Sequence, residues 1–260
     1  MLQKLCSIIV GLGIFAASVN AQAWYETYDY SQVSSQVVSY REEAAVLRGN
    51  AVLIGAQQNL HTAYYDTGSM NLRYVASGRI KFQGTPWNGA HGGNSAVGGQ
   101  VFFSSSPSLA WAYKASWADP RENDFAPLPR NYLHFKGNYR YDDKVVYAYT
   151  VGDSRTVVYE MPQMTSEQVF VRHFSIPQTQ EDMWVKVIDN NSLNIGKDFF
   201  IKSSRFKLEA NEQGIYFVRI PAGTGKLNFS IAYSKLPIAT VNSAGDLRQY
   251  TKGSKARWPQ

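Results

Sequence analysis

The side chains best suited to ligand binding gather in one irregular part of the chain, residues 84–130. Connections this long are uncommon in a β domain and are often functional. Aromatic rings can stack on the apolar face of a sugar, while amide, imidazole and guanidinium groups bond its hydroxyls. The residues that we expect to bind a ligand are Trp87, Asn88, His91, Trp111, Trp117 and Arg121, with Arg140 outside that segment. Trp184 lies in an alternating apolar run and is expected in the core.

Spacing argues against cofactor and metal sites. The glycines of residues 93–98 are spaced as in a phosphate-binding loop, but the Lys and Ser/Thr that hold the nucleotide are absent. The four histidines stand apart, unlike the close ligand pairs of zinc sites. His134 and His173 alternate with apolar neighbours and are expected to be strand residues with bonded ring nitrogens. The run after Asp189 lacks the ligand and the glycine of a calcium loop. We expect no cofactor and no metal.

Nucleophilic catalysis has little support. There is no G-x-S-x-G elbow, and residues 204–207 match S-x-x-K by letters without its companion motifs. Glycoside hydrolases use two carboxylates that have no fixed spacing in the sequence, so a sequence pattern cannot exclude them. A hydrolase or lyase acting on an extracellular polysaccharide therefore stays an alternative, with His91 or a loop carboxylate as acid and base.

The first 23 residues have the form of a secretory signal. Lys4 precedes an apolar run over residues 8–17, and Ala21-Gln22-Ala23 is a small-x-small cleavage site. Cys6 is the only cysteine and lies inside this segment, which excludes a disulfide framework or a covalent haem site in the exported protein. No later apolar run is long enough to span a bilayer. We expect a periplasmic or secreted protein.

Composition favours a folded core and argues against a nucleic-acid partner. Of 260 residues, 44% are hydrophobic and 18% are charged, which is too apolar for a disordered chain. The formal net charge of +6 is mild and spread along the sequence, whereas nucleic-acid binding needs clustered bases. The basic stretch 248–257 can contact an anionic wall polymer or a partner protein.

Period-2 alternation of apolar and polar residues predicts an antiparallel β-sandwich, which at this length can be a large super-sandwich. The expected strands cover residues 51–57, 60–65, 72–76, 79–83, 100–104, 132–139, 144–151, 156–161, 168–175, 183–188, 199–202, 205–209, 214–220 and 226–233. Residues 24–50 are expected to form an arm with one short helix near 38–47, residues 51–245 the sandwich, and residues 246–260 a tail. Two small sandwiches dividing near 161–165 are the alternative.

Three stretches in order resemble one family: NLRYVASGRIKFQGTPWNGAHGG (71–93), APLPRNYLHFKGNYRYDDKVVYAYTVGD (126–153) and DLRQYTKGSKARWP (246–259). The family is an uncharacterised all-β domain, a domain of unknown function, that lies N-terminal to propeller-like and c-type cytochrome modules in large exported bacterial proteins. Asn88 stands where the family usually has an acid, and Tyr141 where it usually has a histidine. The chain has no C-x-x-C-H motif and so carries no c-type haem itself.

The resemblance implies an accessory or substrate-facing module and assigns no reaction. With the loop residues, it leads us to expect an exported, non-catalytic binding module for a glycan or a partner protein. The polysaccharide-active enzyme is one alternative. A docking subunit for a separate propeller or c-type cytochrome protein is the other.

Overall fold

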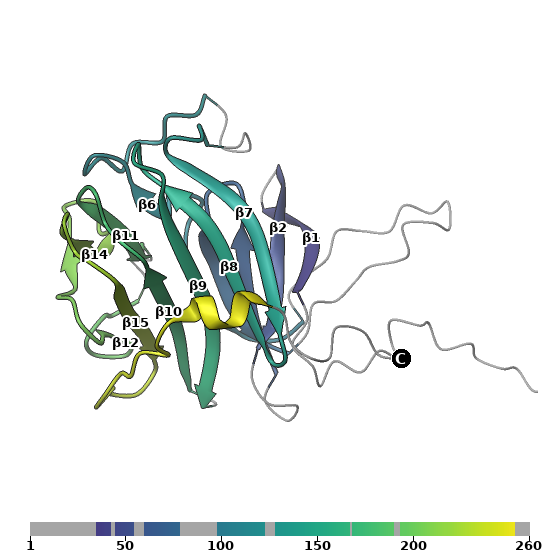
Figure 1. Ribbon diagram of the computed structural model, residues 1–260. Coiled ribbons are helices and arrows are strands. Elements are labelled where there is room, and N and C mark those ends of the chain that lie inside the picture. Colours follow the sequence, from purple (N-terminus) through teal and green to yellow (C-terminus); the bar gives the residue numbers. More distant parts are fainter. Residues whose placement is uncertain are drawn as a thin grey trace, which may run out of the picture.

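The computed structural model describes residues 35–42, 45–54, 60–78, 98–122, 128–166, 168–189 and 193–252. Strands dominate this part of the chain and form three antiparallel sheets (Figure 1). The predicted all-β sandwich fold is confirmed. Within the described ranges, no helix has the length and apolar character needed to cross a membrane.

The first sheet has five strands joined in sequence order, each paired with the next. They are β1 (Ser35–Glu42), β2 (Ala45–Ile54), β3 (His61–Asp66), β4 (Asn71–Ser77) and β5 (Val101–Ser104). The helix expected near residues 38–47 was wrong, because β1 and β2 pair from Ser35↔Val52 to Glu42↔Ala45. The Arg, Glu and Ala residues there favour a helix locally, but strand pairing in the sheet overrides that weak preference.

The second sheet has six strands in the order β12-β15-β10-β9-β8-β7. They are β7 (Leu133–Tyr141), β8 (Lys144–Val151), β9 (Thr156–Ser166), β10 (Val169–Ile176), β12 (Phe200–Ser203) and β15 (Leu227–Ser234). The alternative of two small sandwiches that divide near residues 161–165 is wrong, because β9 runs continuously through those residues.

The third sheet has four strands in the order β13-β14-β11-β6. They are β6 (Trp111–Ala112), β11 (Met183–Ile188), β13 (Glu209–Ala210) and β14 (Tyr216–Ile220). Strand β6 lies inside the segment that we expected to be irregular, and it pairs with the middle of β11. The strand expected over 205–209 reduces to β13, and the one expected over 79–83 lies outside the described residues.

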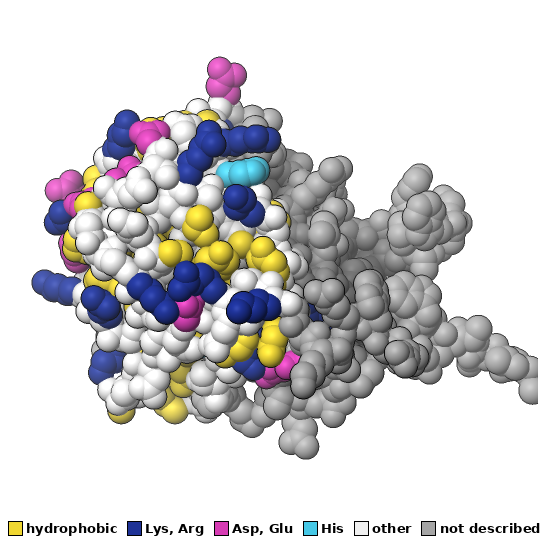
Figure 2. Space-filling view, in the orientation of Figure 1, with side chains coloured by type: hydrophobic (Ala, Val, Ile, Leu, Met, Phe, Trp, Pro, Cys, Tyr) yellow, Lys and Arg dark blue, Asp and Glu magenta, His cyan; other side chains and the backbone are white. Residues whose placement is uncertain are grey.

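The start of the expected C-terminal tail packs on the second sheet. A 3-10 helix, η2 (Leu247–Lys252), crosses the outer face of β7–β10 (Figure 1). Leu247 is fully buried there against Val146 and Met161. Figure 2 shows hydrophobic side chains beside Lys and Arg side chains on this same face.

A buried polar network joins the three sheets at the centre of the core. Arg172 Nε lies 2.7 Å from Oε1 of Glu160, and both side chains are almost fully buried. Tyr65 from the first sheet and Tyr149 from the second donate to the Glu160 carboxylate at 2.9 Å and 2.7 Å. Arg172 Nη1 donates to the carbonyl oxygen of Lys186 in the third sheet at 2.9 Å. Because an unpaired buried charge is costly, this network specifies how the sheets dock.

Candidate functional site

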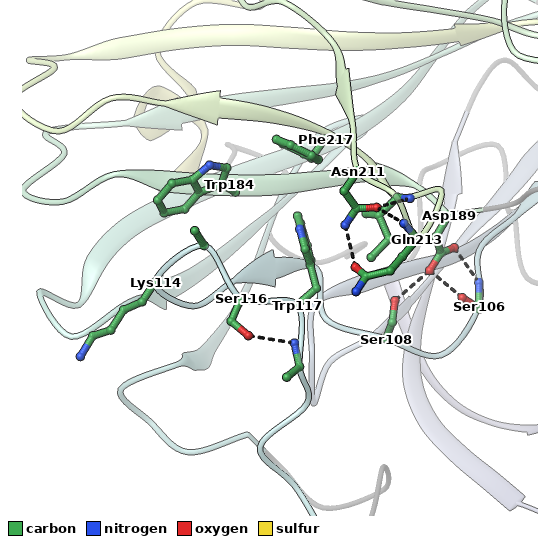
Figure 3. Close-up of a pocket in the computed structure, with 13 residues that line it drawn as sticks. Ser106, Ser108, Lys114, Ser116, Trp117, Trp184, Asp189, Asn211, Gln213 and Phe217 are labelled. Atoms are coloured by element: carbon green, nitrogen blue, oxygen red, sulfur yellow. Dashed lines mark hydrogen bonds between the residues drawn. The ribbon is translucent and has the colours of Figure 1, made fainter.

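A pocket of about 910 Å³ opens on the face of the third sheet that points away from the core (Figure 3). Met183, Val185 and Val187 of β11 point into the core, so the alternating residues Trp184 and Lys186 point to the other face. The lining comes from three separate parts of the chain: Ser106, Ser108, Lys114, Ala115, Ser116, Trp117, Ala118, Trp184, Asp189, Asn211, Gln213, Ile215 and Phe217.

Aromatic side chains form one end of the pocket. The rings of Trp117 and Phe217 lie 5.8 Å apart at 49°. Trp184 is half-buried beside them, and the guanidinium carbon of Arg219 lies 6.0 Å from the centre of its ring. The Arg219 guanidinium is itself ion-paired with Asp182. These contacts hold apolar ring surface in fixed orientations at the pocket wall.

The other end of the pocket is polar and is organised by Asp189, which directly follows β11. Its Oδ1 accepts from the backbone N–H of Ser106 at 2.9 Å. Its Oδ2 accepts from the hydroxyls of Ser106 at 2.6 Å and Ser108 at 2.8 Å, and from Lys186 Nζ at 2.9 Å. Lys186 Nζ also donates to Ser108 Oγ. This cluster ties residues 106–108 to the end of β11.

Opposing effects set the pKa values of this buried pair. Burial acts to raise the pKa of Asp189, but the Lys186 charge and the serine hydrogen bonds outweigh it and hold the pKa at about 2. Burial lowers the pKa of Lys186 to about 8 despite the attraction of Asp189. Both groups are therefore predominantly charged at neutral pH.

Asn211 and Gln213 form a second polar wall. Asn211 Oδ1 accepts from the backbone N–H groups of Gln213 at 3.1 Å and Ile215 at 2.9 Å. Asn211 Nδ2 donates to Gln213 Oε1 at 2.8 Å. The Gln213 amide is thus held with its oxygen occupied, which leaves its Nε2 as the donor for a ligand (Figure 3).

A strained tight turn forms the rim. Tyr113 and Ser116 exchange two backbone hydrogen bonds of 3.0 Å and 2.9 Å, and the two residues between them, Lys114 and Ala115, have φ of 50° and 63°. Such two-residue turns favour Asn and Gly, since other side chains are disfavoured at positive φ. We call residues Tyr113 to Ser116 the rim turn.

Asp153 anchors the rim turn to the β8–β9 connection. The Tyr113 hydroxyl donates to both Asp153 oxygens at 2.7 Å, and Lys114 Nζ lies 3.1 Å from Oδ2. The rings of Tyr113 and Tyr132 stack with centres 3.8 Å apart. Hydrogen bonds from Tyr113, Lys114 and Asn131 lower the pKa of Asp153 to about 2.

The ligand-binding residues expected from the sequence do not form one cluster. Trp117 lines the pocket. Trp111 is 4% exposed and donates from Nε1 to the Tyr149 hydroxyl at 3.2 Å, so it is a core residue and offers no free ring face. Arg121 Nη2 pairs with Asp119 at 2.6 Å, and Arg140 lies on β7, outside the pocket lining. Trp87, Asn88 and His91 lie outside the described residues.

Sequence reasoning missed most of the lining. Trp184 was expected in the core and lies in the pocket wall, because it alternates with the inward residues of β11. Phe217 likewise points away from the core, because it is next to Val218 of β14, which points into the core. The signal was present as strand alternation, but the sequence does not reveal that the second face of this sheet carries a pocket.

The described ranges contain no group of three His, Cys, Asp or Glu side chains arranged to hold a metal ion. The fold and the pocket define an all-β sandwich protein with an open pocket that is aromatic at one end and polar at the other.

One known protein family matches part of this chain. Residues 63–158 match the model of a family described as Domain of unknown function (DUF6797). The matched region runs from β3 into β9 and contains the rim turn and Trp117, whereas Trp184, Asp189 and Gln213 lie beyond it. No curated protein and no solved structure matches the chain.

Proposed function

We propose that this protein is an exported, non-catalytic binding module whose ligand is a glycan held in the pocket. The observation that carries the proposal is the division of one pocket into an aromatic end, with Trp117, Trp184 and Phe217, and a polar end that includes Gln213. Sugars have apolar C–H faces and a rim of hydroxyls, so they match this division.

The aromatic end is organised before a ligand arrives. Trp117 packs against Phe217, and Trp184 is held beside Arg219, whose partner is Asp182. Side chains that are already immobile lose little entropy on binding, and preorganisation raises affinity for that reason. Two tryptophans that already have packing partners therefore favour recognition of a pyranose ring.

The polar end supports binding without turnover. Asp189 carries four hydrogen bonds and a pKa of about 2, whereas a general acid needs a pKa close to the working pH. Ser108 donates its proton to Asp189, and Lys186 is protonated at neutral pH, so no neutral amine is at hand to activate that hydroxyl. As built, this cluster is suited to holding the pocket wall in place.

The export part of the proposal rests on the signal-like residues 1–23. It predicts that the protein accumulates in the periplasm or medium with Trp24 as its first residue. N-terminal sequencing of the protein from a bacterial host tests this. A retained Met1 in the cell extract would contradict it.

The binding part is tested by affinity electrophoresis of the exported protein through gels that contain soluble polysaccharides. We expect retardation by at least one polysaccharide and a loss of at least ten-fold in affinity in Trp184→Ala. Tyr139→Ala is the matched control, because Tyr139 is an exposed aromatic residue on β7, outside the pocket lining. Equal losses in both variants, or no retardation across the panel, would overturn the proposal.

A further inference from the structure

We infer that the glycan is uncharged, an inference that rests on the proposed function and specifies the ligand of the same pocket. The charged residues that line the pocket are Lys114 and Asp189, and Arg219 stands beside its Trp184 wall. Each of them has an opposite charge as its partner within the fold. The three ion pairs are Lys114 with Asp153, Lys186 with Asp189 and Arg219 with Asp182, so no charged residue of the described lining is left without an opposite charge.

The pair at the polar end is closed to a charged ligand. Lys186 Nζ lies 2.9 Å from Asp189 Oδ2, with side-chain exposures of 2% and 6%. The remaining contacts of Asp189 come from Ser106 and Ser108, so a cationic sugar would compete with four donors that already bond this carboxylate. An anionic sugar would have to displace Asp189 from a buried ammonium group, which is costly because the displaced charge is left unpaired.

The pair at the rim is exposed but is held by several contacts. Lys114 Nζ lies 3.1 Å from Asp153 Oδ2 and 4.9 Å from the centre of the Tyr113 ring. A sulfate or carboxylate group at this position would meet Asp153 as well as Lys114. The like charge of Asp153 offsets the attraction, so the rim gives an anion little net advantage.

The third pair flanks the aromatic end. Arg219 is bonded to Asp182, and Asp182 also accepts from the backbone N–H of Ala222 at 2.7 Å. Arg219 therefore supports Trp184 as a paired cation, with its carboxylate partner fixed by the backbone.

Uncharged groups are what the pocket offers to a ligand. The Gln213 amide has its Nε2 available, and Ser116 Oγ accepts from the Ala118 N–H at 3.2 Å, which leaves its own proton to donate. These groups pair well with sugar hydroxyls. The mild net charge of +6 does not mark this pocket for an anionic ligand, because basic side chains are also spread over the face of the six-stranded sheet and η2 (Figure 2).

The test compares polymers that share a backbone and differ in charge. Affinity electrophoresis and titration calorimetry would use dextran with dextran sulfate, hydroxyethyl cellulose with carboxymethyl cellulose, and glycol chitin with glycol chitosan, after a first screen on a mixed glycan array. We expect binding to a neutral glycan that is lost in Trp184→Ala. Its Kd should change less than two-fold between 50 and 500 mM NaCl, because no ion pair with the ligand is screened.

The outcomes separate this inference from the proposed function. Binding only to charged glycans, lost in Trp184→Ala and weakened ten-fold or more by salt, would overturn the inference and leave the glycan-binding function standing. Absence of any binding that depends on Trp184 would overturn both.

Discussion

The ammonium nitrogen of Lys186 lies 2.9 Å from Oδ2 of Asp189, and this pair holds the polar end of the pocket against β11. Both side chains are shielded from solvent, unlike the exposed pair of Lys114 and Asp153. A shielded pair matters chiefly when it is broken, because the remaining charge has neither water nor a partner. The two residues therefore connect the stability of the third sheet to the shape of the pocket.

Replacement of Asp189 tests this connection. Asp189→Asn leaves the Lys186 ammonium buried without a carboxylate, and we expect a loss of about 3–5 kcal/mol in the free energy of unfolding. Urea denaturation followed by tryptophan fluorescence measures it. The double variant Asp189→Asn, Lys186→Met is the control and should recover part of the loss, since the unpaired charge is gone. A single-variant loss below 1 kcal/mol would show that the pair is hydrated.

The rim turn contains a residue whose replacement should stabilise the protein. Ala115 has φ of 63°, a conformation that costs residues other than glycine about 1 kcal/mol or more. We expect Ala115→Gly to raise the melting temperature, with a gain of about 0.5–1 kcal/mol after the backbone entropy of glycine is subtracted. Calorimetry measures the change, and Ala115→Val, with its branched side chain, should lower the melting temperature. A lower melting temperature in Ala115→Gly would contradict the turn assignment.

His173 makes the stability depend on pH. Burial lowers the pKa of His173 to about 4, and its ring nitrogens bond Ser230 Oγ at 2.7 Å and Gln163 Oε1 at 2.9 Å. An unfolded histidine gains a proton below about pH 6.5, while the folded one stays neutral until about pH 4. The stabilisation is complete above pH 6.5 and is lost as the pH falls to 4.

The expected loss over that interval is about 3 kcal/mol, from 1.36 kcal/mol per pKa unit. Urea denaturation at a series of pH values measures it, with His173→Gln as the comparison. The variant should show a shallower decline between pH 6.5 and 4. Parallel curves for the two proteins would exclude His173 as the cause.

The Glu160 and Arg172 pair is expected to behave as one unit. Arg172→Met leaves the Glu160 carboxylate in the core with only tyrosine donors, and we expect a loss of about 3–5 kcal/mol. In the double variant Glu160→Gln, Arg172→Met, the loss should be smaller than the sum of the two single losses by at least about 1 kcal/mol. Equilibrium unfolding of the four proteins in the cycle measures this coupling. Additive losses would mean that the two side chains act independently.

Local patterns predicted the strands well. Strands β8 and β11 begin and end at the expected residues, 144–151 and 183–188, because each is an apolar run that ends at turn residues. The local pattern predicted a helix near residues 38–47, where the structure has the paired strands β1 and β2. Residues that favour a helix locally are overridden there by strand pairing, and a short stretch of sequence does not reveal the pairing partner.

The all-β class and most strand positions could be read from the sequence, because short runs of β-branched and aromatic residues between turn residues mark strands. The pocket depends on long-range strand pairing, which local patterns in the sequence do not report. Pairing of β6 with β11 and of β11 with β14 brings Trp117, Trp184 and Phe217 to one face. The same pairing buries Trp111, which the sequence alone did not separate from Trp117. Alternation reports that a strand has two faces, but long-range pairing decides which of them meets the core and which forms a site.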